Sequence, residues 1–298
     1  MKTLSIYTTE DELKFDFTKV TENTWAPLTD LQSERTGLVE VFDGVMFTTL
    51  IEGYTIFNIR QSKRAAVKAE ALESEFNFRV KKLAAQDISL DMDILLEEVN
   101  VDLTRMSNIT TKDYLTVYDH KGKRFIVDGQ RGKGEDVMHL MHNLFQEDEE
   151  GNTASFEVLM TEPFIMQDIL TKYVLDPKLV PEPLIIGEKI KIGAKTAAGK
   201  KSTSSNITIT KEDVTASEFT EHLTERRAVH SLELDNDGII YATVDHTFMI
   251  SSLKYEGSLK YKEDLALDEC DNWVTEYTQI LPEISKFVNL LEKELIGE

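Results

Sequence analysis

The stretch VHSLELDNDGIIYATV, residues 229–244, decides the fold class of this chain. Runs rich in Val, Leu and Ile lie on both sides of Asp-Asn-Asp-Gly at residues 235–238, and such a turn between two apolar runs is typical of a β-hairpin. Upstream, Thr215 and Glu218 have the spacing of a capping box, which predicts the start of a short helix. The segment therefore predicts antiparallel strands beside a helix.

The same combination recurs twice nearer the N-terminus. Residues 38–50 surround the turn dipeptide Asp43-Gly44 and predict a second hairpin, and residues 114–118 and 124–127 predict a third. Three hairpins, each with a neighbouring helix, predict an α+β fold with antiparallel sheets. The helix after the third hairpin is indicated by apolar residues at helical spacing, which are Val137, Leu140, Met141 and Leu144.

Three other segments complete the predicted architecture. Residues 60–83 have a helical period, and residues 185–192 and 207–210 indicate two extended arms around a tip rich in Gly, Ser and Lys. A last amphipathic helix is predicted to begin at Pro282, because proline is favoured in the first turn of a helix. The apolar stripes expected to be buried are Leu72, Phe76, Val80 and Leu83 in the first helix and Ile284, Phe287, Val288, Leu291 and Leu295 in the last.

These elements predict four parts along the chain. An N-terminal β-rich subdomain covers residues 1–60, and a long basic helix with a helical tip covers residues 61–110. A hairpin–helix subdomain follows at residues 111–160. The C-terminal α+β subdomain covers residues 161–298 and includes a basic finger at residues 185–211.

Charge is distributed unevenly along the chain, whose formal net charge is −21. Residues 60–82, 121–133 and 187–211 are nevertheless basic, with net charges of +4, +4 and +5, so the remainder carries −34. An acidic body repels a polyanion everywhere except at such basic windows. The pattern predicts a surface that holds a phosphate backbone in one place and one orientation.

Composition bounds the class of protein. The chain is 41% apolar and 29% charged, which is typical of an ordinary globular protein. No apolar run is long enough to span a bilayer, and the first residues have no signal-peptide core, so we expect a cytoplasmic protein without membrane contact. Cys270 is the only cysteine, which excludes an internal disulfide and a cysteine-only zinc site.

Motifs for catalysis or cofactors are weak. Residues 193–202 are similar to a phosphate-binding P-loop, but five residues separate the two glycines and a lysine stands where the motif needs a hydroxyl. His139 and His142, or Asp91 and Asp93, are residue types that bind metals, yet neither pair forms a complete ligand set. We therefore expect no catalytic residues, no metal and no cofactor.

Duplex DNA is the partner that the basic windows predict. Contacts from lysine and arginine to phosphate carry no sequence information, so binding should be nonspecific and strongly salt-dependent. Aromatic residues are sparse in these windows, which favours duplex over single-stranded DNA. The residues expected at the DNA are Arg60, Lys63, Arg64, Lys68, Arg79, Lys81, Lys82, Lys189, Lys191, Lys195, Lys200, Lys201 and Lys211.

The chain resembles the recombination-associated RdgC family of bacterial DNA-binding proteins. Short matches are Thr-Trp-Ala-Pro at residues 24–27, Arg-Val-Lys-Lys-Leu at residues 79–83, Leu-Thr-Lys-Tyr-Val at residues 170–174 and Leu-Ile-Ile-Gly-Glu at residues 184–188. The clearest match is residues 211–223, which lead into the hairpin described first. The order of these motifs over most of the chain is what resembles the family.

The resemblance implies a non-enzymatic homodimer closed into a ring, with duplex DNA passing through a positively lined hole. It also implies that the protein is nucleoid-associated and restrains RecA-type recombinases by competing for DNA. Lys211 would lie near the DNA, and Leu103 and Met106, at apolar tip positions, would help to close the ring. The positions implied to face the hole are Arg79, Lys81 and Lys82.

Two other classes of function stay open. The acidic exterior is also typical of an interaction module that presents carboxylates to a basic protein partner, for example by mimicking DNA. A metal-dependent nuclease could use carboxylates such as Asp91 and Asp93. Binding to plain duplex DNA distinguishes the clamp from the mimic, and cleavage with magnesium or manganese tests the nuclease.

Overall fold

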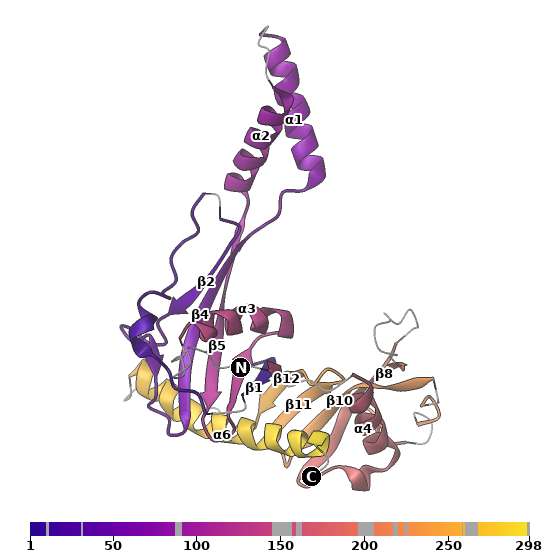
Figure 1. The fold of residues 1–298 in the computed structure, drawn as a ribbon. Coiled ribbons are helices and arrows are strands. Elements are labelled where there is room, and N and C mark those ends of the chain that lie inside the picture. The colour runs from indigo at the N-terminus through magenta and orange to yellow at the C-terminus, as the bar shows by residue number, and fades with distance from the viewer. Residues whose placement is uncertain are drawn as a thin grey trace.

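The computed structural model is one extended antiparallel sheet with helices on both faces (Figure 1). It describes residues 1–9, 12–30, 32–86, 91–144, 157–158, 163–195, 206–216, 220–223, 226–257, 259 and 268–296. Every ladder between its strands is antiparallel. The predicted α+β class with antiparallel pairing is therefore confirmed.

The strands follow the spatial order β2-β4-β5-β6-β1-β12-β11-β10-β8-β9, with β3 beside β4 and β7 beside β1. Their bounds are β1 (Leu4–Thr8), β2 (Glu34–Val39), β3 (Phe47–Thr48), β4 (Tyr54–Arg64), β5 (Ile109–Asp119), β6 (Arg124–Asp128), β7 (Glu157–Val158), β8 (Leu184–Ala194), β9 (Ile207–Thr210), β10 (Arg227–Asn236), β11 (Ile240–Asp245) and β12 (Ile250–Tyr255). The pairing of Leu4 in β1 with Ile250 in β12 joins an N-terminal half of the sheet to a C-terminal half.

Helices cover the two halves differently. The described helices are α1 (Ala69–Ala84), α2 (Met92–Met106), α3 (Arg131–His142), α4 (Pro163–Leu175) and α6 (Glu269–Ile296), with 3-10 turns η1 (Phe17–Val20) and η2 (Pro177–Leu179). In Figure 1, α6 runs beneath both halves, whereas α3 lies on the opposite side of the N-terminal half. Helix α4 packs against β10.

Register defines two faces of the sheet. Leu4, Ile250, Val244, Leu232 and Ile190 are successive cross-strand partners, and they are buried in the same hydrophobic cluster as the apolar residues of α6. We call this the α6 face. Because successive side chains of a strand point to opposite faces, the neighbours of these residues lie on the other side, which we call the α3 face. On the N-terminal half that face is covered by the second cluster, which consists largely of aromatic and aliphatic side chains and includes Tyr7, Tyr118, Phe125, Val137 and Met141.

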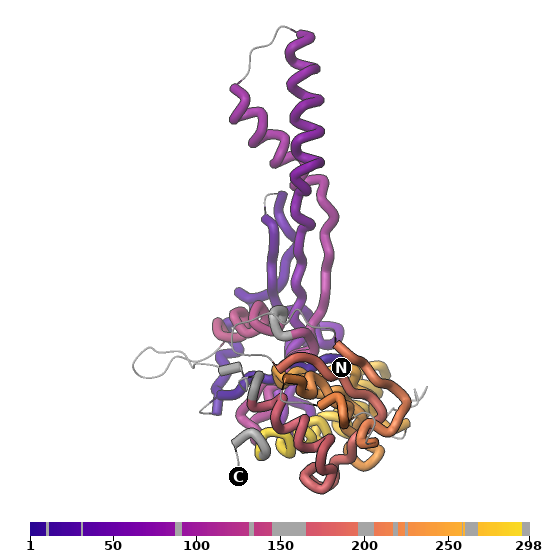
Figure 2. Tube along the Cα trace, turned by 90° about the vertical axis from the view of Figure 1, so that its right-hand side faces the viewer, coloured from indigo at the N-terminus to yellow at the C-terminus, as the bar shows by residue number. Residues whose placement is uncertain are grey.

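A narrow projection of two strands and two helices extends from the N-terminal half. Strands β4 and β5 have eleven residues each and pair in unbroken register from Tyr54 with Asp119 to Arg64 with Ile109. The helical hairpin α1–α2 continues beyond their far end, and we call this hairpin the tower (Figure 2). Of its described residues, those buried are Leu95 and Val99. The tower therefore has little core of its own.

Three predictions about the N-terminal half are wrong in detail. Residues 38–50 do turn at Asp43-Gly44, where Phe42 and Val45 form an isolated bridge, but β2 and β3 both pair with β4 and not with each other. The helix expected from residue 60 begins at Ala69, because residues 60–64 complete β4. The stripe expected to be buried in α1 is only partly covered, since α2 is the one described helix that packs against it.

The other predicted elements fare better. The hairpins β5–β6 and β10–β11, the helix α3 and the paired arms β8 and β9 all form at the expected places. Helix α6 begins at Glu269, so Pro282 lies inside it and not at its start. The expected stripe of α6 is buried from Ile284 to Leu291. The side chain of Leu295, and Glu218 with the tip between the arms, lie outside the described residues.

Candidate nucleic-acid interface

The overall shape is a corner. In Figure 1 the tower and the paired strands β4 and β5 that lead to it, which we call the β-arm, stand upright at one end of the molecule. The C-terminal half of the sheet extends away from their base. Helix α3 lies on the inner side of this corner, and α6 runs along the outer side. A ligand held in the corner would therefore meet the tower, α3 and the α3 face of the C-terminal half.

The β-arm presents two lysines on the α3 face. Lys63 pairs with Thr110 and Gln61 pairs with Lys112, in register with Tyr114, which belongs to the cluster under α3. These residues line a groove of about 330 Å³. Lys63 Nζ lies 2.7 Å from Glu34 Oε2, and its pKa is raised by that hydrogen bond, whereas Lys112 is exposed and has no ion pair with a described residue.

Lys112 was not among the residues expected at the DNA. It lies outside the three basic windows and is followed by an aspartate, so charge counting along the chain passes over it. The alternation of β5, in which Lys112 and Tyr114 share a face, is the signal that identifies its side of the sheet.

The paired strands β8 and β9, which we call the β8–β9 arm, present two more lysines on the α3 face. Ile190 and Ile192 of β8 belong to the core on the α6 face, so Lys189 and Lys191 between and beside them point to the other face. Both lysines lack an ion pair with a described residue, and Lys191 is exposed. Glu233 shares this face, because Leu232 and Leu234 on either side of it are fully buried. This face is therefore mixed in charge and includes unpaired cations.

Two predicted contact residues instead hold the arm together. Arg60 forms a bidentate ion pair with Asp113, at 2.7 and 2.8 Å, and its guanidinium lies 5.2 Å from the centre of the Trp25 ring. The hydrogen bonds to Asp113 raise the pKa of Arg60. Arg64 is only 8% exposed and donates to the backbone carbonyls of four residues, which are Thr29, Gln32, Thr104 and Arg105. Arg64 thus fastens α2 to the top of the arm.

On the tower, Arg79 differs from the lysines around it. Its guanidinium bonds Glu75 at 2.9 Å and Asp102 of α2 at 2.8 Å, and both hydrogen bonds raise its pKa. Arg79 therefore ties the two helices together. The exposed tower lysines without an ion pair to a described residue are Lys68, Lys81 and Lys82.

The apolar residues expected at the tip lie elsewhere. Leu103 and Met106 are in the last turn of α2, at the base of the tower, where α2 leads into β5. Met106 is 80% exposed there. Near the far end, Met92 and Ile94 are more than half exposed, at 54% and 52%. Sequence alone could not distinguish the two ends, because both carry apolar residues at helical spacing.

Three further expected residues have other outcomes. Lys195 pairs with Asp168 at 3.5 Å. Lys211 is exposed, with a left-handed φ of 64°, and its N–H donates to the Glu188 carbonyl at 2.9 Å. Lys200 and Lys201, with most of the P-loop-like stretch, lie outside the described residues.

One cation of the second basic window is a core residue. Arg124 is fully buried and bonds Asp119, Glu292 and Asn289, so it joins β5 and β6 to α6. Burial raises the pKa of Glu292 against the opposing effect of Arg124. The window at residues 121–133 is therefore partly structural.

The residues considered for metal chemistry have ordinary surroundings. Asp91 is the N-cap of α2 and accepts from the Asp93 N–H at 2.9 Å. Among the described residues, no group of three or more His, Cys, Asp or Glu side chains is arranged to hold a metal ion. The Asp91 carboxylate thus caps α2, and Asp93 supplies the backbone N–H that it accepts.

No protein-family model matches the chain, and no curated protein matches it in sequence. The similarity to the RdgC family accordingly stays a prediction that rests on the motifs quoted above. A membrane-spanning helix is not found in the described part of the chain.

Proposed function

We propose that this protein is a nonspecific double-stranded DNA-binding clamp, similar to RdgC, that acts as a ring-shaped homodimer. In this proposal it associates with the nucleoid and restrains RecA-type recombination by competing for DNA, without catalytic activity of its own. The supporting observation is that Lys112 on one arm of the corner, and Lys189 and Lys191 on the other, share the α3 face. Each lacks an ion pair with a described residue.

Charge explains why the α3 face is favoured over the rest of the surface. A chain with a net charge of −21 repels the DNA backbone in most orientations, and unpaired lysines on one face select the orientation in which it can approach. Lysine contacts to phosphate do not read sequence. They release counterions from the DNA, so the affinity depends on the salt concentration.

Exposed apolar residues on the tower support the homodimer. Phe78, Met92 and Ile94 are 61%, 54% and 52% exposed, on a helical hairpin with almost no buried residues. A second copy that covers them would supply the missing layer and extend the corner into a closed ring. Leu103 and Met106 stay candidates for the same interface from the base of the tower.

Fluorescence anisotropy with a labelled duplex of arbitrary sequence, over a series of salt concentrations, tests DNA binding. The wild-type protein should show a linear fall of log affinity with log salt. The double variant Lys112→Glu/Lys191→Glu should bind roughly tenfold or more weakly, and its salt slope should be smaller by about two, because two phosphate contacts are lost.

The matched control is Lys293→Glu, an exposed lysine on α6, at the outer side of the corner. Its single charge reversal should change the affinity much less than either single reversal on the α3 face. Equal losses from Lys293→Glu, Lys112→Glu and Lys191→Glu would refute an interface on the α3 face, since net charge alone would then explain binding. If the wild-type protein does not bind the duplex even at low salt, the result would instead favour the acidic interaction module.

Competition with a recombinase is tested separately by strand exchange. The wild-type protein should inhibit strand exchange by a RecA-type recombinase in proportion to the fraction of duplex that it occupies. Lys112→Glu/Lys191→Glu should lose this inhibition. If the variant inhibits as well as the wild type, the inhibition does not act through DNA.

A further inference from the structure

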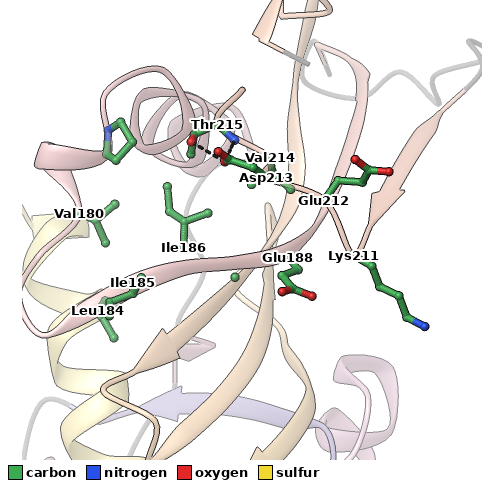
Figure 3. Close-up of a pocket in the computed structure, with 12 residues that line it drawn as sticks. Val180, Leu184, Ile185, Ile186, Glu188, Lys211, Glu212, Asp213, Val214 and Thr215 are labelled. Atoms are coloured by element: carbon green, nitrogen blue, oxygen red, sulfur yellow. Dashed lines mark hydrogen bonds between the residues drawn. The ribbon is translucent and has the colours of Figure 1, made fainter. Parts of the chain in front are cut away.

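A groove of about 600 Å³ lies at the far edge of the C-terminal half, away from the α3 face lysines of the β-arm. One wall is the first half of β8, residues 184–188, and the other is formed by Pro177, Val180 and residues 211–215 (Figure 3). We call it the β8 groove. In Figure 3 the side chains of Val180 and Ile186 lie across the groove from each other.

The backbone of β8 is an open sheet edge along this groove. Strand β9 pairs only with residues 189–192 of β8, and one more bond joins the Lys211 N–H to the Glu188 carbonyl. Ile185 and Ile186 pair with β10 on one side, and no described strand pairs with them on the other. An unpaired edge of this kind offers backbone donors and acceptors to an incoming extended segment.

The groove also provides apolar contacts for side chains of such a segment. Leu184 and Val214 are buried at 5% and 1% exposure and form part of its lining. Ile185 and the neighbouring Leu179 are 56% and 51% exposed, so apolar surface is left uncovered at its margin. Strand addition uses backbone bonds for affinity and such apolar surface for selection of side chains.

Charge at the groove favours a cationic segment. Glu188, Glu212 and Asp213 line it together with one cation, Lys211, whose side chain extends away from the apolar residues in Figure 3. The hydroxyl of Thr215 donates to Asp213 at 2.6 Å and its N–H donates at 3.0 Å, and these bonds lower the pKa of Asp213. Asp213 therefore stays ionised at neutral pH.

We propose that the β8 groove binds an extended peptide segment of a basic protein partner, by strand addition along residues 185–187, since the Leu184 N–H and both backbone groups of Glu188 already have partners. The segment would alternate apolar residues, directed at Ile186 and Val214, with lysine or arginine directed at Glu188 and Glu212. This site is distinct from the proposed DNA interface, because carboxylates dominate it and would repel phosphate.

The probe is a fluorescent peptide of sequence Lys-Val-Lys-Val-Lys-Val, capped at both ends, and anisotropy measures its binding to the full chain. Two matched probes accompany it. One replaces lysine by glutamate, and the other carries N-methyl groups on its valines, which remove backbone donors and leave the charge unchanged. The unmodified lysine peptide should bind at least tenfold more tightly than either.

The variant Glu188→Lys/Glu212→Lys should lose at least tenfold in affinity for the lysine peptide. The matched control is Glu22→Lys/Glu52→Lys, which makes the same change of net charge at two exposed residues of the N-terminal half and should change the affinity less than twofold. Equal binding of the N-methylated peptide, or equal losses in the two variants, would overturn the proposal, since nonspecific attraction to an acidic protein would then explain the binding.

Sedimentation identifies a different occupant. If Glu188→Lys/Glu212→Lys shifts a monomer–dimer equilibrium of the chain itself, a second copy occupies the groove and the peptide proposal is wrong. Duplex affinity of the same variant distinguishes this site from the DNA interface. It should not fall, because two anions are replaced by cations, so loss of peptide binding with DNA binding retained separates the two proposals.

Discussion

The β-arm of the N-terminal half and the β8–β9 arm of the C-terminal half each contain residues of a basic window, yet the cations of the two windows have opposite roles there. On the first, Arg60 and Lys63 are ion-paired and Arg64 is buried. On the second, Lys189 and Lys191 have no ion pair with a described residue. A basic window in a sequence is therefore not by itself a binding surface.

Cross-strand neighbours explain the difference. Strand β4 is flanked by β2 and β5, which place Asp113 opposite Arg60 and Glu34 opposite Lys63. The two lysines of β8 have uncharged neighbours instead. Thr210 is opposite Lys189, and Lys191 has Thr208 on one side and Ser231 on the other. Opposite charges directly across a ladder stabilise it, so the first set of cations supports the fold and the second remains available.

The largest effect on stability is expected at Arg124, the extreme case of a paired cation. Arg124→Ala leaves Asp119 and Glu292 without their buried partner and should lower the free energy of unfolding by about 3–5 kcal/mol. Urea denaturation measures this loss. Lys121→Ala, at an exposed residue of the adjoining turn, is the control and should change stability by less than about 0.5 kcal/mol. A small loss in Arg124→Ala would contradict a structural role.

The second prediction compares the two arms directly. Arg64→Ala removes hydrogen bonds from a buried charged donor to four carbonyls and should cost about 1.5–3 kcal/mol. Lys191→Ala should leave stability within about 0.5 kcal/mol of the wild type but should weaken duplex binding. If both variants lose stability equally, the contrast between supporting and available cations does not hold.

These contrasts show what the sequence could predict and what it could not. The hairpin β10–β11 was predictable, because Asp235 and Gly238 form a local turn in which the Gly238 N–H donates to Asp235 at 2.7 Å. The ion pair of Arg60 with Asp113 was not, because 53 residues separate them and the tower intervenes. A local turn is determined by residues close together in the sequence, whereas cross-strand charge pairing depends on a strand register that no short segment specifies.

The candidate site shows the same division. Net positive windows drew attention to β8, but they also included Arg124, whose side chain is buried against α6, a helix from the far end of the chain. The start of α6 was missed for a related reason. Proline is favoured in the first turn of a helix, so Pro282 suggested a helix start. In the structure α6 continues through the turns before Pro282, and the buried residues Ile280 and Leu281 of those turns belong to the large hydrophobic cluster.

A smaller effect is expected from the partly exposed pair of Arg60 and Asp113. Ion pairs at the surface contribute little because water and salt screen them, so a double-mutant cycle with Arg60→Gln and Asp113→Asn should give a coupling of about 0.2–1 kcal/mol. The coupling should decrease in high salt. If this coupling energy is as large as the stability loss of Arg64→Ala, then exposure to solvent does not determine how much each cation of the β-arm contributes to stability.

The smallest effect concerns pH at the base of the β8–β9 arm. His230 Nε2 donates to the Ala194 carbonyl at 2.7 Å, and the His246 ring centroid lies 4.8 Å from that of His230. Burial lowers the pKa of His230, with smaller lowering effects from His246 and Lys191, against raising effects from the Ala194 hydrogen bond and Asp245. The folded protein therefore binds this proton less readily than the unfolded chain does.

A group with a lowered pKa in the folded state contributes stability above its ordinary pKa, 6.5 for this histidine, and loses that contribution as pH falls through the folded-state value. The wild-type urea midpoint should thus decrease between pH 7.5 and pH 5.5, and His230→Asn should decrease less because asparagine does not titrate. His139→Asn, at an exposed imidazole of α3, controls for loss of a histidine as such and should follow the wild type. Parallel decreases in all three proteins would show that protonation elsewhere dominates. If the decrease is smaller in His230→Asn than in the two proteins that retain His230, then acid weakens the β8–β9 arm. The paired cations of the β-arm are unaffected in the same pH range, so the two regions differ in a second, independent property.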